Sequence, residues 1–275
     1  MIQSSTLPTI RFSRLSQISV LCGAFFVLYP SSGCFKWGSR ATQSLPEETA
    51  LSKSYDYSGT VIVVGAGSAG LAAARVLEEN NIQYTVLEAT ENHGGRLQEH
   101  VDFADFPIDL GAEWIHNNPE ILDILSGIDG LSSEMDLIPY HLESAFSWDG
   151  ETYEAINQSE QDDYFEFFPE YKFKSTTWYS FVNEHYGKIV SDKIQFNTVV
   201  SEIDYSGDDV LVTTTNGDIF QADKVLVTVS IGVLKSGDIT FIPTLNAQKI
   251  EAFESVEFLQ GMKVVMKFSE KFSPD

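Results

Sequence analysis

Three glycines and one glutamate carry the clearest chemical signal in this sequence. Gly65, Gly67 and Gly70 form a G-x-G-x-x-G pattern between an apolar run and an alanine-rich segment. In a strand–turn–helix unit these glycines allow the turn, the approach of a pyrophosphate and close packing, and the helix start binds the phosphates. Glu88 follows Gly70 by 18 residues, where a carboxylate can accept hydrogen bonds from a ribose diol. The pattern predicts a dinucleotide site, and by itself it fits NAD and FAD equally.

A second glycine pair, in the loop "NHGGR", helps to choose between these cofactors. Gly94, Gly95 and Arg96 come shortly after Glu88, where the chain must pass back over the cofactor. The glycines would let the main chain lie flat against a ligand, and Arg96 would place a guanidinium on phosphate oxygens. NAD dehydrogenases have no general need for this second phosphate contact. The loop therefore favours FAD.

Five segments, in this order, resemble the flavin-containing amine oxidase family: "VIVVGAGSAGLAAARVL", "VLEA....GGR", "DLGAEWIH", "VLVTVSIGVLK" and "GMKVVMKF". The most similar branch is that of the polyamine oxidases, alongside related histone demethylases and monoamine oxidases. The resemblance covers residues 60–275. It implies an α/β fold, with a Rossmann-type FAD-binding domain and a mixed α+β substrate lobe. Family members continue well beyond the position of Asp275, so the resemblance also implies a truncated, N-terminal portion.

The resemblance implies a role for each matching position. The residues expected to hold the ADP half and pyrophosphate of FAD are Gly65, Gly67, Ser68, Ala69, Gly70, Glu88, Ala89, Gly94, Gly95 and Arg96. The residues expected along the flavin ring are Gly111, Ala112, Glu113 and Trp114. Val200 matches a position whose backbone contacts the adenine. The two predicted catalytic residues are His116, facing the substrate cavity, and Lys263, holding a water against the flavin and assisting reoxidation by O₂. No metal ligand is predicted.

Simpler interpretations compete for three of these residues. His116 could be an ordinary histidine at the boundary of the core, and Trp114 could serve packing alone. Lys263 could be a surface lysine on an edge strand, because such a strand would show the alternation of "KVVMKF" without any catalytic role. The sequence also departs from the family at Asn92, where an arginine is usual. This change removes one positive contact near the phosphates.

The dinucleotide site requires a βαβ unit to position it. Residues 60–64 predict a first strand, and residues 84–89 predict a second. The helix between them ends at Asn80–Asn81. The residues expected on its apolar face are Ala69, Ala72, Ala73, Val76 and Leu77. Such a unit demands a parallel sheet with a buried first strand.

The remaining elements define the expected domains. Residues 117–195 predict a separate, mostly helical lobe, and residues 208–230 contain two strand patterns around Asn216–Gly217, a strong hairpin signal. Met262 to Phe268 reads as a further strand. The expected division is a leader (1–35), a linker (36–58), a FAD-binding domain in two parts (59–116 and 196–240), a substrate lobe (117–195), and the start of its second segment (241–275).

The charge balance limits the classes of partner. The chain carries 40 acidic and 17 basic residues, a formal net charge of −23. A body this acidic is a poor partner for nucleic acid, whose binding depends on Lys and Arg. The acidity could steer a cationic substrate, or it could simply maintain solubility. Both cysteines, Cys22 and Cys34, lie in the leader, so the body contains neither a disulfide framework nor a cysteine metal site.

The leader has the order of a secretory signal. Arg11 and Arg14 precede an apolar run at residues 18–29, and small residues follow it. The run is short for a membrane span, which needs about 20 residues. We therefore expect a secreted protein, or one in a secretory or organellar compartment, with no stable membrane span beyond the leader. A retained N-terminal membrane anchor is the alternative.

The predicted reaction is FAD-dependent oxidation of a polyamine-like amine to an imine and then an aldehyde, with O₂ reduced to H₂O₂. Its partners are a small-molecule amine and O₂. One alternative is a related FAD oxidoreductase that acts on a non-amine substrate, against which "GAEWIH" argues. The other alternative is an inactive flavin-binding fragment.

Overall fold

The computed structural model describes residues 18–21, 25–28, 57–116, 118–140, 145–148, 151–157, 159, 162, 166, 168–257 and 261–269. The chain divides into two compact units. The larger unit comprises Ser44–Pro139 and Glu170–Met262, and the smaller unit comprises Met1–Gln43, Tyr140–Pro169 and Lys263–Asp275. All the predicted site residues except Lys263 belong to the larger unit.

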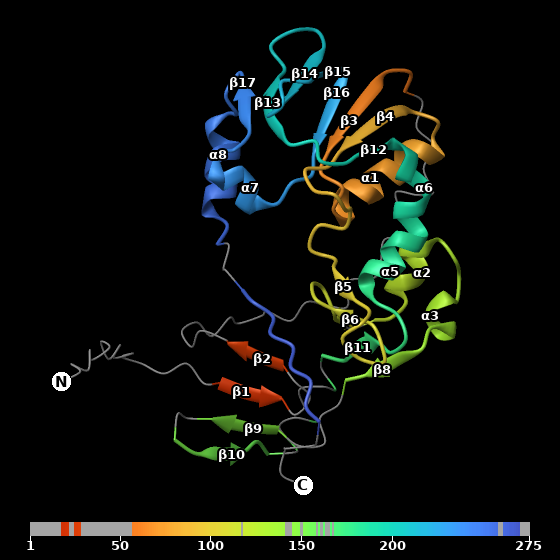
Figure 1. Ribbon diagram of the computed structural model, residues 1–275, viewed down its shortest axis with the longest axis vertical. Helices are drawn as coiled ribbons and strands as arrows, with labels where there is room; N and C mark the ends of the chain where they lie inside the picture. The colour runs from red at the N-terminus through yellow and green to blue at the C-terminus, as the bar shows by residue number, and fades with distance from the viewer. Residues whose placement is uncertain are drawn as a thin grey trace, which may run out of the picture. The chain divides into compact units, whose positions relative to one another are not determined.

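A four-stranded parallel sheet forms the centre of the larger unit (Figure 1). Its strands, in spatial order, are β12 (Ile194–Gln195), β4 (Gln83–Leu87), β3 (Thr60–Val64) and β16 (Lys224–Val227). Helix α1 (Ser68–Glu79) connects β3 to β4 and completes the predicted βαβ unit. The carboxyl ends of parallel strands meet at one edge of a sheet. The segments that follow β3, β4 and β16 therefore lie together.

Strand β3 is buried on both of its faces. Val61 and Val63 belong to one apolar core, together with residues of α1, while Ile62 and Val64 belong to a second core. Successive side chains of a strand point to opposite faces, so alternate residues of the apolar run pack into different cores. This explains why the run has no polar alternation. The prediction of an α/β fold with a buried first strand is confirmed.

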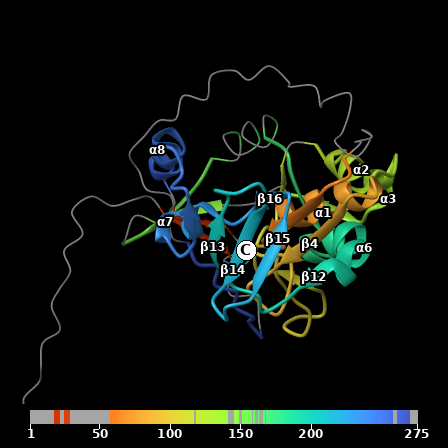
Figure 2. The same ribbon diagram turned by 90° about the horizontal axis from the view of Figure 1, so that it is seen from above.

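A second sheet covers the face of the parallel sheet that carries Ile62 and Val64 (Figure 2). Its strands, in spatial order, are β15 (Ile219–Ala222), β14 (Val210–Thr214), β13 (Val200–Asp204) and β17 (Thr240–Ile242). The β14–β15 hairpin turns at Asn216–Gly217, as predicted. Residues 208–230 hold three strands rather than two, because β16 leaves the hairpin and pairs with β3. Helices α7 (Ile231–Ser236) and α8 (Ala247–Ser255) lie before and after β17 in the chain.

The described part of the chain between β4 and β12 contains helices and short strands, which agrees with the expected mixed α+β substrate lobe and adds strands to the mostly helical pattern. Its helices are α2 (Ile121–Ser126), α3 (Leu131–Glu134) and the consecutive turns α5 (Trp178–Val182), η2 (Asn183–Gly187), α6 (Lys188–Val190) and η3 (Ser191–Lys193). Its strands in the larger unit are β8 (Leu137–Pro139) and β11 (Glu170–Phe173), which pair with each other. Strand β11 also pairs with β7 (Ile115–His116), and β5 (Glu99–His100) pairs with β6 (Ile108–Asp109). The short strands escaped prediction because each is too brief to show an alternation of its own.

The buried face of α1 matches the predicted one only in part, since Ala72 and Leu77 pack against the core. Its buried residues are Gly70, Leu71 and Ala74, whereas Ala69 is exposed. The alanines did not indicate which face of the helix is buried, because a methyl side chain is tolerated on either face. The boundaries were predicted well, since the helix ends at Asn80.

The smaller unit contains an antiparallel sheet with the strand order β10 (Tyr153–Ala155), β9 (Ala145–Trp148), β1 (Ile18–Leu21) and β2 (Phe25–Leu28). Met262 to Phe268 does not form the predicted strand, because a strand needs a hydrogen-bonded partner and no described strand pairs with it. Apart from β1, β2 and residues 57–58, the predicted leader and linker lie outside the described residues, as do residues 270–275. Within the described residues, no helix has the length and apolar character needed to cross a membrane.

Candidate functional site

The turn between β3 and α1 requires glycine at its first and last positions. Gly65 has a φ of +99°, in the left-handed region, and its N–H donates to the Leu87 carbonyl at 2.8 Å. A Cβ at Gly70 would lie 1.9 Å from the Gly65 carbonyl oxygen and 2.8 Å from Thr228 Oγ1. Helix α1 can therefore approach β3 this closely only if Gly70 has no side chain. Both glycines shape the turn and position the helix start.

The start of α1 has the features of an anion-binding site. Gly67 is the N-cap residue, and no side chain caps the helix. By contrast, the side chains of Thr177, Ser230 and Asn246 cap helices α5, α7 and α8. A Cβ at Gly67 would meet nothing within 4 Å, so open space lies beside the first amides of α1. The free N–H groups of a helix start, with room beside them, suit a phosphate group.

Glu88 follows β4 and is held against the glycine turn. Its side chain is only 8% exposed, and Oε2 accepts a hydrogen bond from the Ala66 N–H at 2.7 Å. Oε1 accepts from the N–H of Thr90 at 3.0 Å and from its hydroxyl at 2.8 Å. A carboxylate offers about four lone-pair directions, so Glu88 retains capacity to accept from a ribose hydroxyl. The neighbouring Ala89 is exposed.

The loop that carries Gly94 and Gly95 lies directly beside the glycine turn. The Gly94 N–H donates to the Ala66 carbonyl at 2.8 Å, and Gly94 forms an isolated β-bridge with Gly67. Gly94 and Gly95 have φ angles of +106° and +59°, and a Cβ at Gly95 would lie 3.3 Å from the Gly67 Cα. Two motifs that are 24 residues or more apart in the sequence thus form one backbone surface.

Helical turns support the other side of this loop. His93 Nε2 lies 3.0 Å from Asn183 Oδ1, and its ring stacks on Tyr179 with 5.5 Å between the ring centroids. Burial raises the pKa of the Tyr179 phenol, and the negative charge of Glu99 raises it further. Tyr179 therefore stays neutral at physiological pH. The loop is fixed between the glycine turn and a packed, uncharged surface.

Arg96 places its charge in solvent, at the end of the same loop. Its side chain is exposed and forms no ion pair or hydrogen bond with any residue that the structure describes. Its carbonyl oxygen accepts from the Ala112 N–H at 3.2 Å. The backbone is thus held in place while the guanidinium can bind phosphate oxygens.

The "GAEW" segment packs against this loop through its backbone. A Cβ at Gly111 would lie 1.7 Å from the Arg96 carbonyl oxygen, so the two chains touch at a position where only glycine fits. The Leu110 N–H donates to the Gln98 carbonyl at 2.8 Å, and Ala112 is exposed. The "GAGSAG", "GGR" and "GAEW" segments are therefore joined in sequence order by hydrogen bonds.

Glu113 and Trp114 share a partner that the sequence did not reveal. Lys172 on β11 forms an ion pair with Glu113, and its Nζ lies 4.0 Å from the centre of the Trp114 ring. The Trp178 Nε1 donates to the Trp114 carbonyl at 3.2 Å. Strand β11 therefore holds the two side chains, and α5 holds the backbone of the segment.

His116 lies on β7 and its side chain is 64% exposed. Its Nδ1 lies 3.2 Å from Glu170 Oε1, and Glu170 is its cross-strand neighbour on β11. The structure therefore brings His116 next to "GAEW" and gives it an acidic partner. That His116 faces a substrate cavity stays a prediction.

Val200 is buried at the start of β13. Just before it, the Thr198 N–H donates to the Glu88 carbonyl at 2.8 Å, so the chain reaches Val200 directly after contacting Glu88. A backbone contact of Val200 with an adenine stays a prediction. The role of Lys263, in the smaller unit, also stays a prediction.

Sequence reasoning missed Thr228 at this site. Thr228 follows β16 and its hydroxyl lies 2.9 Å from the Val64 carbonyl and 3.0 Å from the Gly65 carbonyl. It therefore fixes the first glycine of the turn. The available signal was its place after an apolar strand pattern, because the ends of parallel strands converge.

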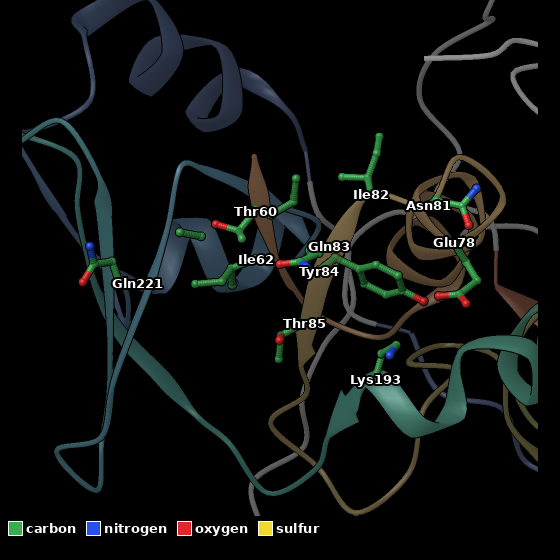
Figure 3. Close-up of a pocket in the computed structure, with 12 residues that line it drawn as sticks. Thr60, Ile62, Glu78, Asn81, Ile82, Gln83, Tyr84, Thr85, Lys193 and Gln221 are labelled. Carbon is green, nitrogen blue, oxygen red and sulfur yellow. The ribbon is translucent and has the colours of Figure 1, made fainter. Parts of the chain in front are cut away.

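The hollow shown in Figure 3 lies at the opposite edge of the parallel sheet. It has a volume of about 500 Å³ and begins at Thr60 and Gln83, the first residues of β3 and β4. Glu78, Tyr84 and Lys193 also line it. None of the predicted site residues does, so we assign the site by the glycine motifs and not by this hollow.

The sequence of this chain is similar to those of known proteins. The sequence model of the family described as "Flavin containing amine oxidoreductase" matches residues 68–187 and 179–275. Lysine-specific histone demethylase 2 of Homo sapiens is 27% identical, over 82% of this chain and 36% of its own length. Polyamine oxidase 1 of Zea mays is 26% identical over 78% and 61%, and Polyamine oxidase 2 of Arabidopsis thaliana is 28% identical over 88% and 63%. The chain thus spans about one third to two thirds of the length of these relatives.

Proposed function

The chain belongs to the family of flavin containing amine oxidoreductases. We therefore propose that it oxidises a polyamine-like amine, with O₂ as the electron acceptor. The cofactor of the family is FAD. When bound, FAD would supply the two-electron oxidation of the C–H bond beside the amine nitrogen, with O₂ as the final electron acceptor reduced to H₂O₂. The organic product is an imine, which water hydrolyses to an aldehyde.

The observation that carries this proposal is the convergence of three motifs into one cradle. The hydrogen bond from Gly94 to Ala66 joins the first two motifs, and that from Ala112 to Arg96 joins the last two. Open space beside Gly67 and the exposed guanidinium of Arg96 fit a pyrophosphate. The partly satisfied carboxylate of Glu88 fits a ribose diol.

Two further features support an amine as the substrate. The net charge of −23 favours the approach of a cation. The exposed His116 pairs with the partly buried Glu170 beside "GAEW", where a carboxylate and an imidazole can bind or deprotonate an ammonium group. Relatives that cover most of this chain are named polyamine oxidases, which favours a polyamine over a simple monoamine.

The experiment is to load the purified chain with FAD and measure H₂O₂ release with four substrates. They are spermine, spermidine, benzylamine and a peptide with a methylated lysine. Release with spermine or spermidine supports the proposal. Release only with the peptide assigns a demethylase-type substrate, and release only with benzylamine assigns a monoamine. Bound FAD without release in any assay contradicts the proposal and favours a non-amine substrate or a flavin-binding role without oxidation. A Gly67→Ala chain serves as the control for FAD-dependent turnover.

We also propose that the N-terminal residues direct the protein into a secretory or organellar compartment, with a retained membrane anchor as the alternative. Support comes from Arg11 and Arg14 before the apolar run at residues 18–29. A reporter protein fused to residues 1–35 tests this proposal. Export with cleavage supports a signal, retention in the membrane fraction supports an anchor, and a cytosolic reporter contradicts both.

A further inference from the structure

Strand β11 presents two charged side chains toward the "GAEWIH" segment. In the antiparallel register of β11 and β7, Glu170 lies opposite His116 and Tyr171 lies opposite Ile115. Continuing this register by one residue brings Lys172 opposite Trp114. Side chains alternate along a strand, so Glu170 and Lys172 share one face of β11. Glu170 contacts His116, and Lys172 contacts Glu113 and Trp114.

The ammonium group of Lys172 lies in a site of two complementary parts. The Glu113 carboxylate supplies the counter-charge, and the Trp114 indole supplies a π face 4.0 Å away. The Lys172 and Glu113 side chains are only 19% and 11% exposed, so water screens the ion pair weakly. An aromatic face combined with a carboxylate is an arrangement that binds alkylammonium groups well. Here the alkylammonium group belongs to the protein itself.

The "GAEW" segment depends on such outside contacts for its geometry. Residues 111–114 belong to no helix or strand. Their backbone is held on one side by the Ala112 bond to Arg96, and on the other by the Trp178 bond to Trp114. Among the described residues, Lys172 contacts both large side chains of the segment with its charged group. Without its charge, the nearly buried Glu113 carboxylate would move toward water and take the segment with it.

We infer that Lys172 is a positioning residue of the flavin site, whose ammonium group fills the space between Glu113 and Trp114 and fixes the "GAEW" segment where the flavin binds. The inference rests on the proposed function only in that FAD occupies this cradle. It does not depend on which amine is oxidised. It also implies that Glu113 is neutralised internally and does not anchor the substrate.

The test compares four chains: wild type, Lys172→Met, Lys172→Arg and the control Lys174→Met. Lys174 follows β11 directly, but it is 60% exposed and pairs with the exposed Asp136 at 3.5 Å. FAD affinity is measured by quenching of flavin fluorescence, and the environment of the ring by visible circular dichroism of bound flavin. We expect Lys172→Met to weaken FAD binding about tenfold, or ~1.4 kcal/mol, and to change the dichroism. Lys172→Arg should restore most of both, and Lys174→Met should match wild type.

A chemical rescue separates positioning from general stability. Lys172→Ala should regain FAD affinity when n-butylammonium is added, because the free cation can occupy the space between Glu113 and Trp114. The uncharged n-butanol should have no effect. A purely structural loss would respond to neither compound or to both equally, and that result would overturn the inference.

A second readout does not involve flavin at all. Thermal unfolding of the apo chain with Lys172→Met, Glu113→Gln and both changes forms a double-mutant cycle. Coupled effects support the inference, and additive effects overturn it. FAD affinity within about twofold of wild type for Lys172→Met, with unchanged dichroism, also overturns it. If the wild-type chain binds FAD but oxidises no amine, the proposed function fails while these comparisons still decide the role of Lys172.

Discussion

Gly67→Ala should separate folding from cofactor binding. Gly67 has φ −71° and ψ −179°, which any residue adopts, and its Cβ would meet nothing within 4 Å. The apo fold should therefore lose only about 0.5–1 kcal/mol, because alanine is a poorer N-cap than glycine. The new methyl group would occupy the space beside the first amides of α1, where a pyrophosphate must approach. Losing one charge-assisted hydrogen bond there costs ~1.5–3 kcal/mol, so FAD should bind about 10- to 150-fold more weakly.

Gly70→Ala is the matched change, and here the fold itself should lose stability. Its Cβ would lie 1.9 Å from the Gly65 carbonyl oxygen, and a backbone atom cannot rotate out of the way as a side chain can. Overpacking of this kind costs about 1–3 kcal/mol or more, and each kcal/mol lowers the Tm by about 2–4 °C in a domain of this size. Because α1 must shift, FAD affinity should fall as well.

The assays are thermal unfolding of the apo chains by circular dichroism and titration with FAD by flavin fluorescence. The account predicts that Gly67→Ala nearly keeps the wild-type Tm and loses FAD affinity, while Gly70→Ala loses both. Wild-type FAD affinity in Gly67→Ala would refute the placement of the pyrophosphate at α1. An unchanged Tm in Gly70→Ala would refute the close approach of α1 to β3.

Three further changes test other parts of the site. Glu88→Gln should lower both the Tm and the FAD affinity, because the amide N–H₂ would face the Ala66 or Thr90 donor and leave that donor unpaired. An unpaired buried donor costs ~1–3 kcal/mol. Thermal unfolding and FAD titration check this prediction, and unchanged values would contradict it. Arg96→Gln should change the free energy of unfolding by no more than about 0.5 kcal/mol, because the side chain is exposed. It should nevertheless weaken FAD binding and reduce the dependence of that binding on salt. FAD titrations at low and high salt test it, and an unchanged salt dependence would argue against a phosphate contact. Burial lowers the pKa of His185, and Arg75 lowers it further against the opposing charge of Glu184. The folded state therefore resists protonation, and stability should fall as the pH drops below the ordinary value of about 6.5; His185→Gln should reduce this fall between pH about 7.5 and about 5.5, and an equal fall in both chains would count against it.

Local features of the sequence predicted the βαβ unit and the glycines that its turn requires. Gly65, Gly70 and Gly94 could be identified because a tight turn or a close approach requires glycine wherever the rest of the chain lies. The order of the motifs then placed "GGR" and "GAEW" near the turn. The hydrogen bonds of Gly94 and Ala112 agree with that placement.

Contacts between distant parts of the chain could not be predicted in the same way. Lys172 is separated from Glu113 by 59 residues, and Thr228 from Gly65 by 163. A single lysine or threonine gives no periodic signal, and only the pairing of β11 with β7 and of β16 with β3 brings each to the site. The apolar face of α1 was predicted only in part for a related reason, since its alanines fit either face.

The most direct test of the central claim is the stoichiometry of cofactor binding by the wild-type chain. Equilibrium dialysis with FAD, alone and in the presence of excess NAD, measures both the number of sites and their selectivity. The account predicts one tightly bound FAD per chain that NAD does not displace, because "GGR" and "GAEW" extend the cradle beyond the first glycine turn. Absence of FAD binding, or its displacement by NAD, would contradict it.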